Sequence, residues 1–149
     1  MEELRELYQQ VILDHNKAPR NFGKLEDATH KAAGDNPLCG DHVDLYVSVE
    51  DGIIKNIMFE GKGCAISKAS ASLMTEELKG KTVEEAREIF QKFHEMVTDD
   101  NVVPDMDELG KLVALAGVRE FPIRVKCASL AWHTFNEAME QTNRIAKTE

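Results

Sequence analysis

Three cysteines and one aspartate supply the residue types in this sequence that could do chemistry. Cys39 lies in Pro-Leu-Cys-Gly-Asp, Cys64 in Gly-Lys-Gly-Cys and Cys127 in Arg-Val-Lys-Cys. Asp41 follows Cys39 by two residues. A thiolate binds metal ions or attacks as a nucleophile, and a carboxylate is an acceptable hard ligand beside soft sulfurs. The set is therefore compatible with a closed Zn²⁺ site of three cysteines and one aspartate.

Each cysteine is expected at a junction between a loop and a regular element. Cys39 precedes a predicted strand, Cys64 precedes a predicted helix, and Cys127 is predicted to begin a helix. At a helix N-terminus the unpaired N–H groups and the helix dipole favour the thiolate form. If the segment from Cys39 to Asp41 is extended, both side chains fall on one face and His42 points to the other.

The spacing of the cysteines does not establish a metal site by itself. Cys39 and Cys64 are separated by 24 residues, and Cys64 and Cys127 by 62, which matches no zinc-finger spacing. The alternative is that the cysteines are small buried hydrophobic residues and that Asp41 is a turn residue. Arg124 and Lys126 flank Cys127, and they either lower the pKa of its thiol and contact an anionic partner, or are ordinary surface charge.

The elements that must position these residues are indicated by hydrophobic periodicity. Helical spacing predicts helices over 2–16 and 65–78, and a capping box of Thr82 and Glu85 begins another. Alternation over 43–49 and 53–60, with Asp51-Gly52 between them, predicts a β-hairpin. The polar stretch 34–37 is expected to be a loop. A short helix is expected over 107–115, irregular chain over 117–126, and then a long helix that begins at Cys127 and whose apolar stripe runs from Ala131 to Ile145.

Strands early in the chain and helices late predict an α+β fold. We expect a small antiparallel sheet of about three strands with helices packed on one face. The length of 149 residues suits a single domain over 1–149.

The charge balance disfavours several classes of partner. With 18 basic and 27 acidic residues the net charge is −9, which repels nucleic-acid backbones and anionic lipid surfaces. The first residues lack the basic-then-apolar pattern of a secretory signal, and no apolar run approaches the length of a membrane span. We therefore expect a cytoplasmic protein without nucleic-acid or membrane partners.

Three short motifs resemble one known family. They are Asn-Pro-Leu-Cys-Gly-Asp at 36–41, Gly-Lys-Gly-Cys-Ala-Ile-Ser at 61–67 and Lys-Cys-Ala at 126–128. In this order they resemble the NifU/IscU-like family of iron–sulfur cluster biogenesis, over nearly the whole chain. Scaffold members of that family have a histidine immediately before the third cysteine, where this chain has Lys126, and a shorter interval between the second and third cysteines. Both departures resemble the SufU branch, whose members bind zinc and work with a SufS-type cysteine desulfurase.

The resemblance implies a site and an activity. Cys39, Asp41, Cys64 and Cys127 would bind Zn²⁺, and the protein would be a sulfurtransferase that takes persulfide sulfur from the desulfurase. Cys39 is the expected acceptor, because Gly40 gives its loop freedom to move and lets a partner backbone approach closely. Arg124 and Lys126 would contact the partner, and downstream cluster-assembly proteins are further expected partners.

Two other interpretations remain open from the sequence. In the first, the protein is a scaffold on which a transient [2Fe–2S] cluster is assembled and passed to target proteins, since three thiolates and a carboxylate could ligate one. In the second, it is a binding module whose zinc is purely structural.

Overall fold

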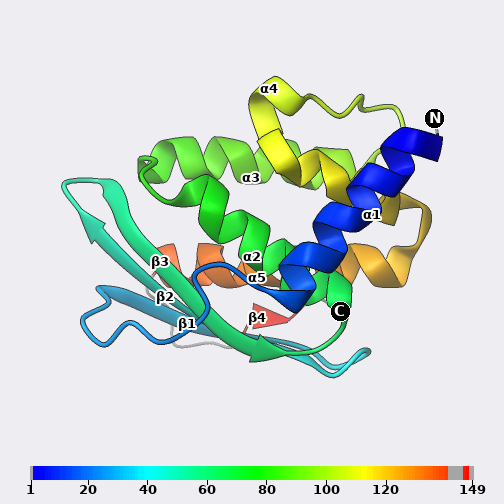
Figure 1. Ribbon diagram of the computed structural model, residues 1–149. Helices are drawn as coiled ribbons and strands as arrows, with labels where there is room; N and C mark the ends of the chain where they lie inside the picture. The colour runs from blue at the N-terminus through cyan, green and yellow to red at the C-terminus, as the bar shows by residue number, and fades with distance from the viewer. Residues whose placement is uncertain (1, 141–145, 148–149) are drawn as a thin grey trace.

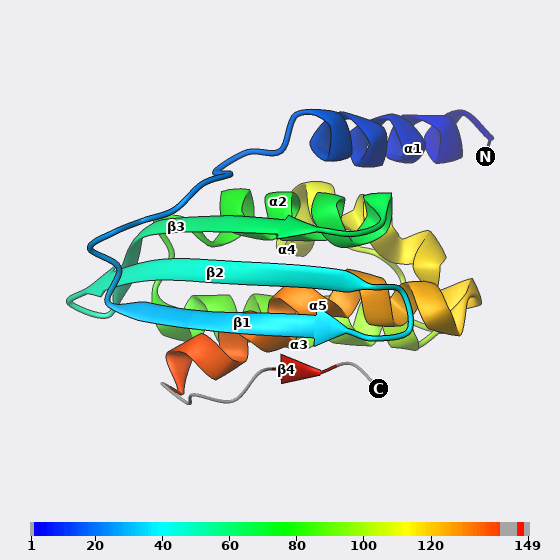
Figure 2. The same ribbon diagram turned by 90° about the horizontal axis from the view of Figure 1, so that it is seen from below.

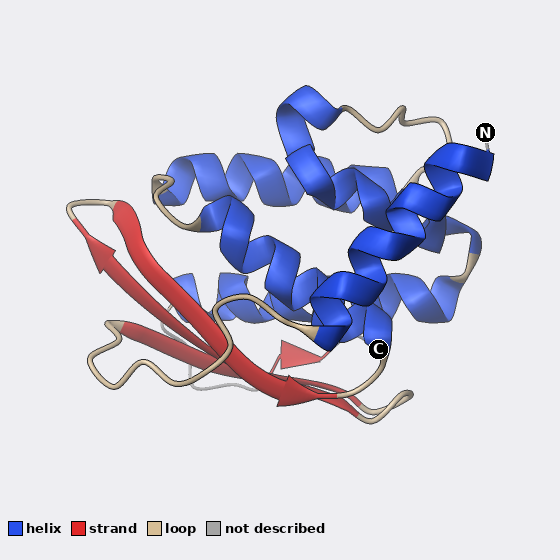
Figure 3. Ribbon diagram, viewed as in Figure 1, coloured by secondary structure: helices blue, strands red, loops and turns tan. Residues whose placement is uncertain are grey.

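The computed structural model describes residues 2–140 and 146–147 and shows a twisted sheet with helices packed on one of its faces (Figures 1 and 3). In chain order the elements are α1 (Glu2–Lys17), β1 (His30–Asn36), β2 (Asp41–Glu50), β3 (Ile53–Lys62), α2 (Ala65–Leu78), α3 (Val83–Thr98), α4 (Met106–Leu109), the 3₁₀-helix η1 (Gly110–Glu120), α5 (Pro122–Met139) and β4 (Ala146–Lys147).

The sheet has the strand order β3-β2-β1-β4, with β1, β2 and β3 antiparallel and the two-residue β4 parallel to β1 (Figure 2). Alternate residues of β2, namely Val43, Leu45 and Val47, are buried, as expected for a strand with one face on a hydrophobic core. The α+β class and the helical layer on one face are confirmed. The hairpin at Asp51-Gly52 joins β2 to β3 as predicted.

Strand β1 corrects the expectation that residues 34–37 form a loop, because 34–36 belong to a seven-residue strand. Gly34 does not form a turn but lies where β1 approaches α5 closely. A β-carbon there would overlap Thr134 Oγ1 and lie 3.1 Å from Leu130 Cδ1, both on α5. The absent side chain therefore lets β1 pack directly against α5. A polar strand of this kind lacks the hydrophobic alternation by which strands are recognised in sequence.

Helix α5 corrects a second expectation, since it begins at Pro122 and Cys127 lies in its second turn. The predicted irregular stretch 117–126 is largely helical. Proline at the first helical position loses no hydrogen bond, and its fixed φ suits the helix, so Pro122 starts α5 instead of breaking the chain. The predicted stripe residue Ile145 lies outside the described residues. Among the helices that the structure describes, none is both long and apolar enough to cross a membrane.

One buried hydroxyl connects α2, which begins just after Cys64, to α5, which contains Cys127. Ser70 Oγ on α2 donates to the carbonyl oxygen of Ala128 on α5 at 2.6 Å and accepts from Trp132 Nε1 at 3.2 Å. The Trp132 ring is fully buried and stacks on Phe93 of α3 with ring centroids 4.6 Å apart. Because Ala128 adjoins Cys127, these contacts fix the position of Cys127 relative to α2.

The burial of His15 predicts acid sensitivity of the fold. His15 is 1% exposed on α1, and its Nδ1 lies 2.7 Å from Ser72 Oγ on α2. Burial, with the nearby Arg20 charge, lowers the pKa of His15 below its usual value. The unfolded chain therefore binds this proton more readily, so the stability from His15 is complete above about pH 6.5 and is lost as the pH falls toward the folded-state pKa. The slope cannot exceed about 1.4 kcal/mol per pH unit.

Chemical denaturation between pH 7.5 and 5.5, with a metal chelator present, checks this prediction. The free energy of unfolding of the wild type should fall more steeply with acidification than that of His15→Gln. Parallel curves for the two proteins would contradict it.

Candidate metal centre

The four residues singled out in the sequence meet at one end of the sheet. Cys39 Sγ and Cys127 Sγ lie 3.4 Å apart, and a ligand atom from each of Cys39, Asp41 and Cys127 falls within 4.8 Å of the other two. Cys64 Sγ lies 3.8 Å from Asp41 Oδ2, at the side of this group. The donors come from the β1–β2 loop, the start of β2, the residue before α2, and α5. The fold thus brings together residues that are far apart in the sequence.

Asp41 and Cys64 are held to each other by a backbone hydrogen bond. The Asp41 carboxylate is buried, and the backbone N–H of Cys64 donates to its Oδ1 at 2.8 Å. Cys64 caps α2 as predicted, with its sulfur accepting from the backbone N–H of Ser67 at 3.4 Å. The carboxylate packs over Gly63, where a β-carbon would overlap Asp41 Oδ1. This contact requires glycine at position 63.

Cys39 is the exposed member of the set, whereas Cys64 is half-buried and Cys127 is buried. It lies in the turn between β1 and β2, whose backbone N–H groups at Cys39 and Gly40 both donate to the carbonyl oxygen of Asn36, at 3.2 and 2.9 Å. Gly40 has φ +70°, so the segment from Cys39 to Asp41 is a turn and not extended chain. The turn, and not strand alternation, brings Cys39 and Asp41 together.

The electrostatics of Cys127 differ from the expectation for a helix start. Burial raises the pKa of the Cys127 thiol, and hydrogen bonding to Cys39, Asp41 and Cys64 raises it further. A buried thiol against a carboxylate and two more thiols favours a cation among them, because a bound cation converts coordinating thiols to thiolates. The donor set of three sulfurs and one oxygen fits a closed Zn²⁺ site.

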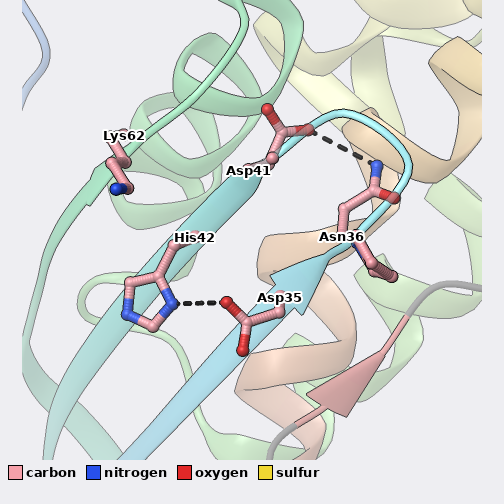
Figure 4. A pocket seen from close by; sticks show the side chains of 7 residues that line it. Asp35, Asn36, Asp41, His42 and Lys62 are labelled. Carbon is pink, nitrogen blue, oxygen red and sulfur yellow. Dashed lines mark hydrogen bonds and ion pairs between the residues drawn. The ribbon is translucent and has the colours of Figure 1, made fainter.

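Asn36, the last residue of β1, is a member of the site that the chemical reasoning from sequence did not single out. It is fully buried, and its Nδ2 donates to Asp41 Oδ2 at 3.4 Å (Figure 4). The same Nδ2 donates to Cys127 Sγ at 3.6 Å. The sequence signal that could have identified Asn36 is its position beside Pro37 in the first motif. A neutral amide is neither a strong metal ligand nor a nucleophile. Residue type and spacing therefore do not identify Asn36 as a candidate site residue.

His42 faces away from the sulfurs, as the strand alternation predicts. Its Nδ1 lies 2.7 Å from Asp35 Oδ1 and its Nε2 lies 3.1 Å from Asp44 Oδ1. The hydrogen bond to Asp35 raises the pKa of His42, with burial opposing and Asp44 adding to the rise. Asp35, His42 and Lys62 line a pocket beside the β1–β2 hairpin (Figure 4), and the pair of Asp35 and His42 joins the two strands next to the turn that contains Cys39.

Arg124 and Lys126 lie on the first turns of α5, outside the group of donor atoms. Arg124 is exposed, with its guanidinium carbon 4.5 Å from the ring centroid of Phe121, and Lys126 is half-buried. Within the described residues, neither side chain forms a hydrogen bond or ion pair with a residue of the site.

A polar sheet end with three thiols and a buried carboxylate defines this molecule as a small α+β protein with a thiol-rich centre whose donor atoms could hold a metal ion. The model of the NifU-like N-terminal domain matches residues 7–128, and the chain belongs to this family.

Relatives of the chain have names from iron–sulfur cluster assembly. The scaffold protein IscU of Thermotoga maritima is 41% identical over 138 residues, which cover 93% of this chain and 96% of the relative. The zinc-dependent sulfurtransferase SufU of Bacillus subtilis is 42% identical over 133 residues, covering 89% of each chain. A solved SufU structure from Fervidobacterium islandicum, described as an assembly scaffold for the SUF system, has 36% identity and a TM-score of 0.82, covering 91% of this chain and 98% of that one.

The contact between Gly63 and Asp41 predicts that Gly63→Ala weakens metal binding. The added β-carbon displaces the Asp41 carboxylate, and we expect a loss of at least about tenfold in zinc affinity, measured by competition with a chromophoric chelator. Gly80→Ala is the matched control, because Gly80 also has positive φ but its β-carbon would meet nothing within 4 Å. Both changes strain the backbone by about 1–2 kcal/mol. Equal zinc affinities in the two variants would contradict the prediction.

Proposed function

We propose that this protein is a zinc-dependent sulfur acceptor that takes persulfide sulfur from a SufS-type cysteine desulfurase and supplies it to iron–sulfur cluster biogenesis. The observation that supports this most directly is the position of Cys39, an exposed thiol on a turn at the edge of a donor set that is otherwise largely buried. A partner's active-site cysteine can reach Cys39, while Cys127 is enclosed. The similarity to the zinc-dependent sulfurtransferase SufU supports the same role.

In this proposal Cys39, Asp41, Cys64 and Cys127 hold the Zn²⁺ ion. When bound, zinc keeps the coordinating sulfurs deprotonated and holds the loop, the strand end and the two helices in one arrangement. Asp41 supplies one negative charge to the site without being a nucleophile toward sulfur. The three thiols are free, and a reducing compartment such as the cytoplasm keeps them so.

The transfer step conserves atoms and electrons. The thiolate of Cys39 attacks the terminal sulfur of the partner's cysteine persulfide. The sulfur–sulfur bond of the partner breaks, a new one forms on Cys39, and the partner's cysteine leaves as a thiolate. The transferred sulfur keeps its proton and its oxidation state, so no external oxidant or reductant takes part. The freed desulfurase can then begin another turnover.

The surface beside Cys39 suits contact with a large partner. Leu38, the residue before Cys39, is 63% exposed, and Arg124 at the start of α5 is exposed too, so its guanidinium can pair with an acidic group of a partner. We propose that Arg124 and Lys126 contact the desulfurase and that downstream cluster-assembly proteins receive the sulfur.

Turnover of a SufS-type desulfurase at rising concentrations of the zinc-loaded protein tests the proposal. We expect saturable stimulation with ping-pong kinetics, and a gain of one sulfur atom in mass on the peptide that contains Cys39. Cys39→Ala should return turnover to the level of the desulfurase alone. If Cys39→Ser retained activity while Cys64→Ser lost it, the assignment of the acceptor would be wrong.

A scaffold for a [2Fe–2S] cluster is the second candidate function, and it is favoured by the scaffold descriptions of the T. maritima and F. islandicum relatives. The donor set of Cys39, Asp41, Cys64 and Cys127 could hold such a cluster.

Anaerobic reconstitution with ferrous iron and sulfide distinguishes the two functions. If the protein is a sulfur acceptor, the wild type should hold little cluster, and Lys126→His, which adds an imidazole next to Cys127, should hold more. A stoichiometric cluster on the wild type that transfers to an apo-ferredoxin, without stimulation of the desulfurase, would favour the scaffold.

A further inference from the structure

Asn36 is in contact with three of the four proposed ligands. Its side-chain Nδ2 donates to Asp41 Oδ2 at 3.4 Å and to Cys127 Sγ at 3.6 Å. Its backbone carbonyl oxygen accepts from the N–H of Cys39 at 3.2 Å and from that of Gly40 at 2.9 Å. A single residue at the end of β1 therefore touches β2, α5 and the turn that contains Cys39.

The contacts of Asn36 are of two kinds. Those to Asp41 and Cys127 come from an amide that is fully buried, whereas those to the exposed turn with Cys39 are hydrogen bonds to the backbone carbonyl oxygen of Asn36. Amide N–H groups directed at a carboxylate and a sulfur stabilise negative charge on both. The side chain can thus keep Asp41 and Cys127 in place.

The oxygen of the Asn36 side-chain amide is in an unusual environment. Asn36 Oδ1 is buried and, among the residues that the structure describes, has no hydrogen-bond partner. Buried polar atoms in folded proteins nearly always have partners, so an exception at a polar site calls for an explanation such as a functional role. An apolar residue of the same size would avoid this orphaned acceptor, so packing alone does not account for asparagine here.

We infer that Asn36 is a positioning residue of the metal centre, which orients Asp41 and Cys127 as ligands through its side-chain amide and connects the turn of Cys39 to them through its backbone. This inference rests on the metal site of the proposed function. It assigns a residue outside the ligand set that would keep Asp41 and Cys127 in place as ligands when the metal is bound. Hydrogen-bond partners of metal ligands act in this way, and their loss lowers metal affinity by about 10–100-fold.

Metal binding by Asn36→Leu and Asn36→Ala tests the inference. Leucine keeps the volume of the side chain and alanine leaves a cavity, but both remove the amide donors. Asn56→Leu is the control, because the Asn56 side chain accepts from the neighbouring backbone N–H of Ile57 and, within the described residues, has no hydrogen bond to the site; it lies several residues along β3 from the end that carries the donor atoms. Zinc affinity is measured by chelator competition, and Co²⁺ alone is used as a spectroscopic probe of thiolate coordination, in variants whose folding is checked by circular dichroism.

We expect both Asn36 variants to bind zinc about 10–100-fold more weakly than wild type and to show altered cobalt–thiolate bands, with Asn56→Leu unchanged. Folded Asn36 variants with wild-type affinity and spectrum would overturn the inference alone. A wild-type protein without cobalt–thiolate bands would overturn the proposed metal site together with it.

A measurement on the wild type does not depend on the folding of any variant. The side-chain amide resonances of Asn36 should shift when zinc binds, and those of Asn56 should not. Unshifted Asn36 resonances in the zinc-loaded protein would also overturn the inference.

Discussion

The arrangement of the site depends on the hydrogen bonds that the buried carboxylate of Asp41 accepts. A carboxylate removed from water must be compensated by donors, or its burial costs several kcal/mol. Here the donors are the backbone N–H of Cys64 and the amide of Asn36. Satisfying this one group brings the end of β1 and the start of α2 to the start of β2. Cys127 then joins the group through the second contact of Asn36.

The helical layer supplies the rigidity that this end of the sheet needs. The hydroxyl of Ser70 on α2 donates a hydrogen bond to α5 beside Cys127, and the absence of a side chain at Gly34 lets β1 pack closely against α5. These contacts are buried, and none of them involves a residue of the exposed turn that contains Cys39. The exposed thiol is suited to meet a partner, and the buried residues are suited to keep a metal ion.

An exposed Cys39 beside more buried donor residues is compatible with both functions named among the relatives, the scaffold protein and the sulfurtransferase. Three thiols and a carboxylate can bind zinc or a cluster, so the ligand types alone do not separate sulfur acceptor from scaffold. The two functions make different demands on Cys39, because its sulfur has to react in sulfur transfer and has to remain a ligand in a cluster. Lys126, next to Cys127 on α5, stands where the scaffold members that the sequence resembles have a histidine.

Local sequence was sufficient for the parts of the molecule that local forces determine. The capping box of Thr82 and Glu85, the limits of α2 and the hairpin between β2 and β3 all follow from neighbouring residues, and the motifs around the cysteines identified the four candidate ligands. The tertiary structure alone decided that the polar segment ending at Asn36 is a strand, that Cys127 lies inside a helix, and that Asn36 contacts Asp41 and Cys127. Asn36 and Cys127 lie 91 residues apart in the chain, and their contact exists only because β1 packs on α5. Hydrophobic periodicity and helix capping depend on residues that are close in the sequence. The hydrogen-bond partner of a buried polar group, by contrast, can come from any part of the chain that the fold brings next to it.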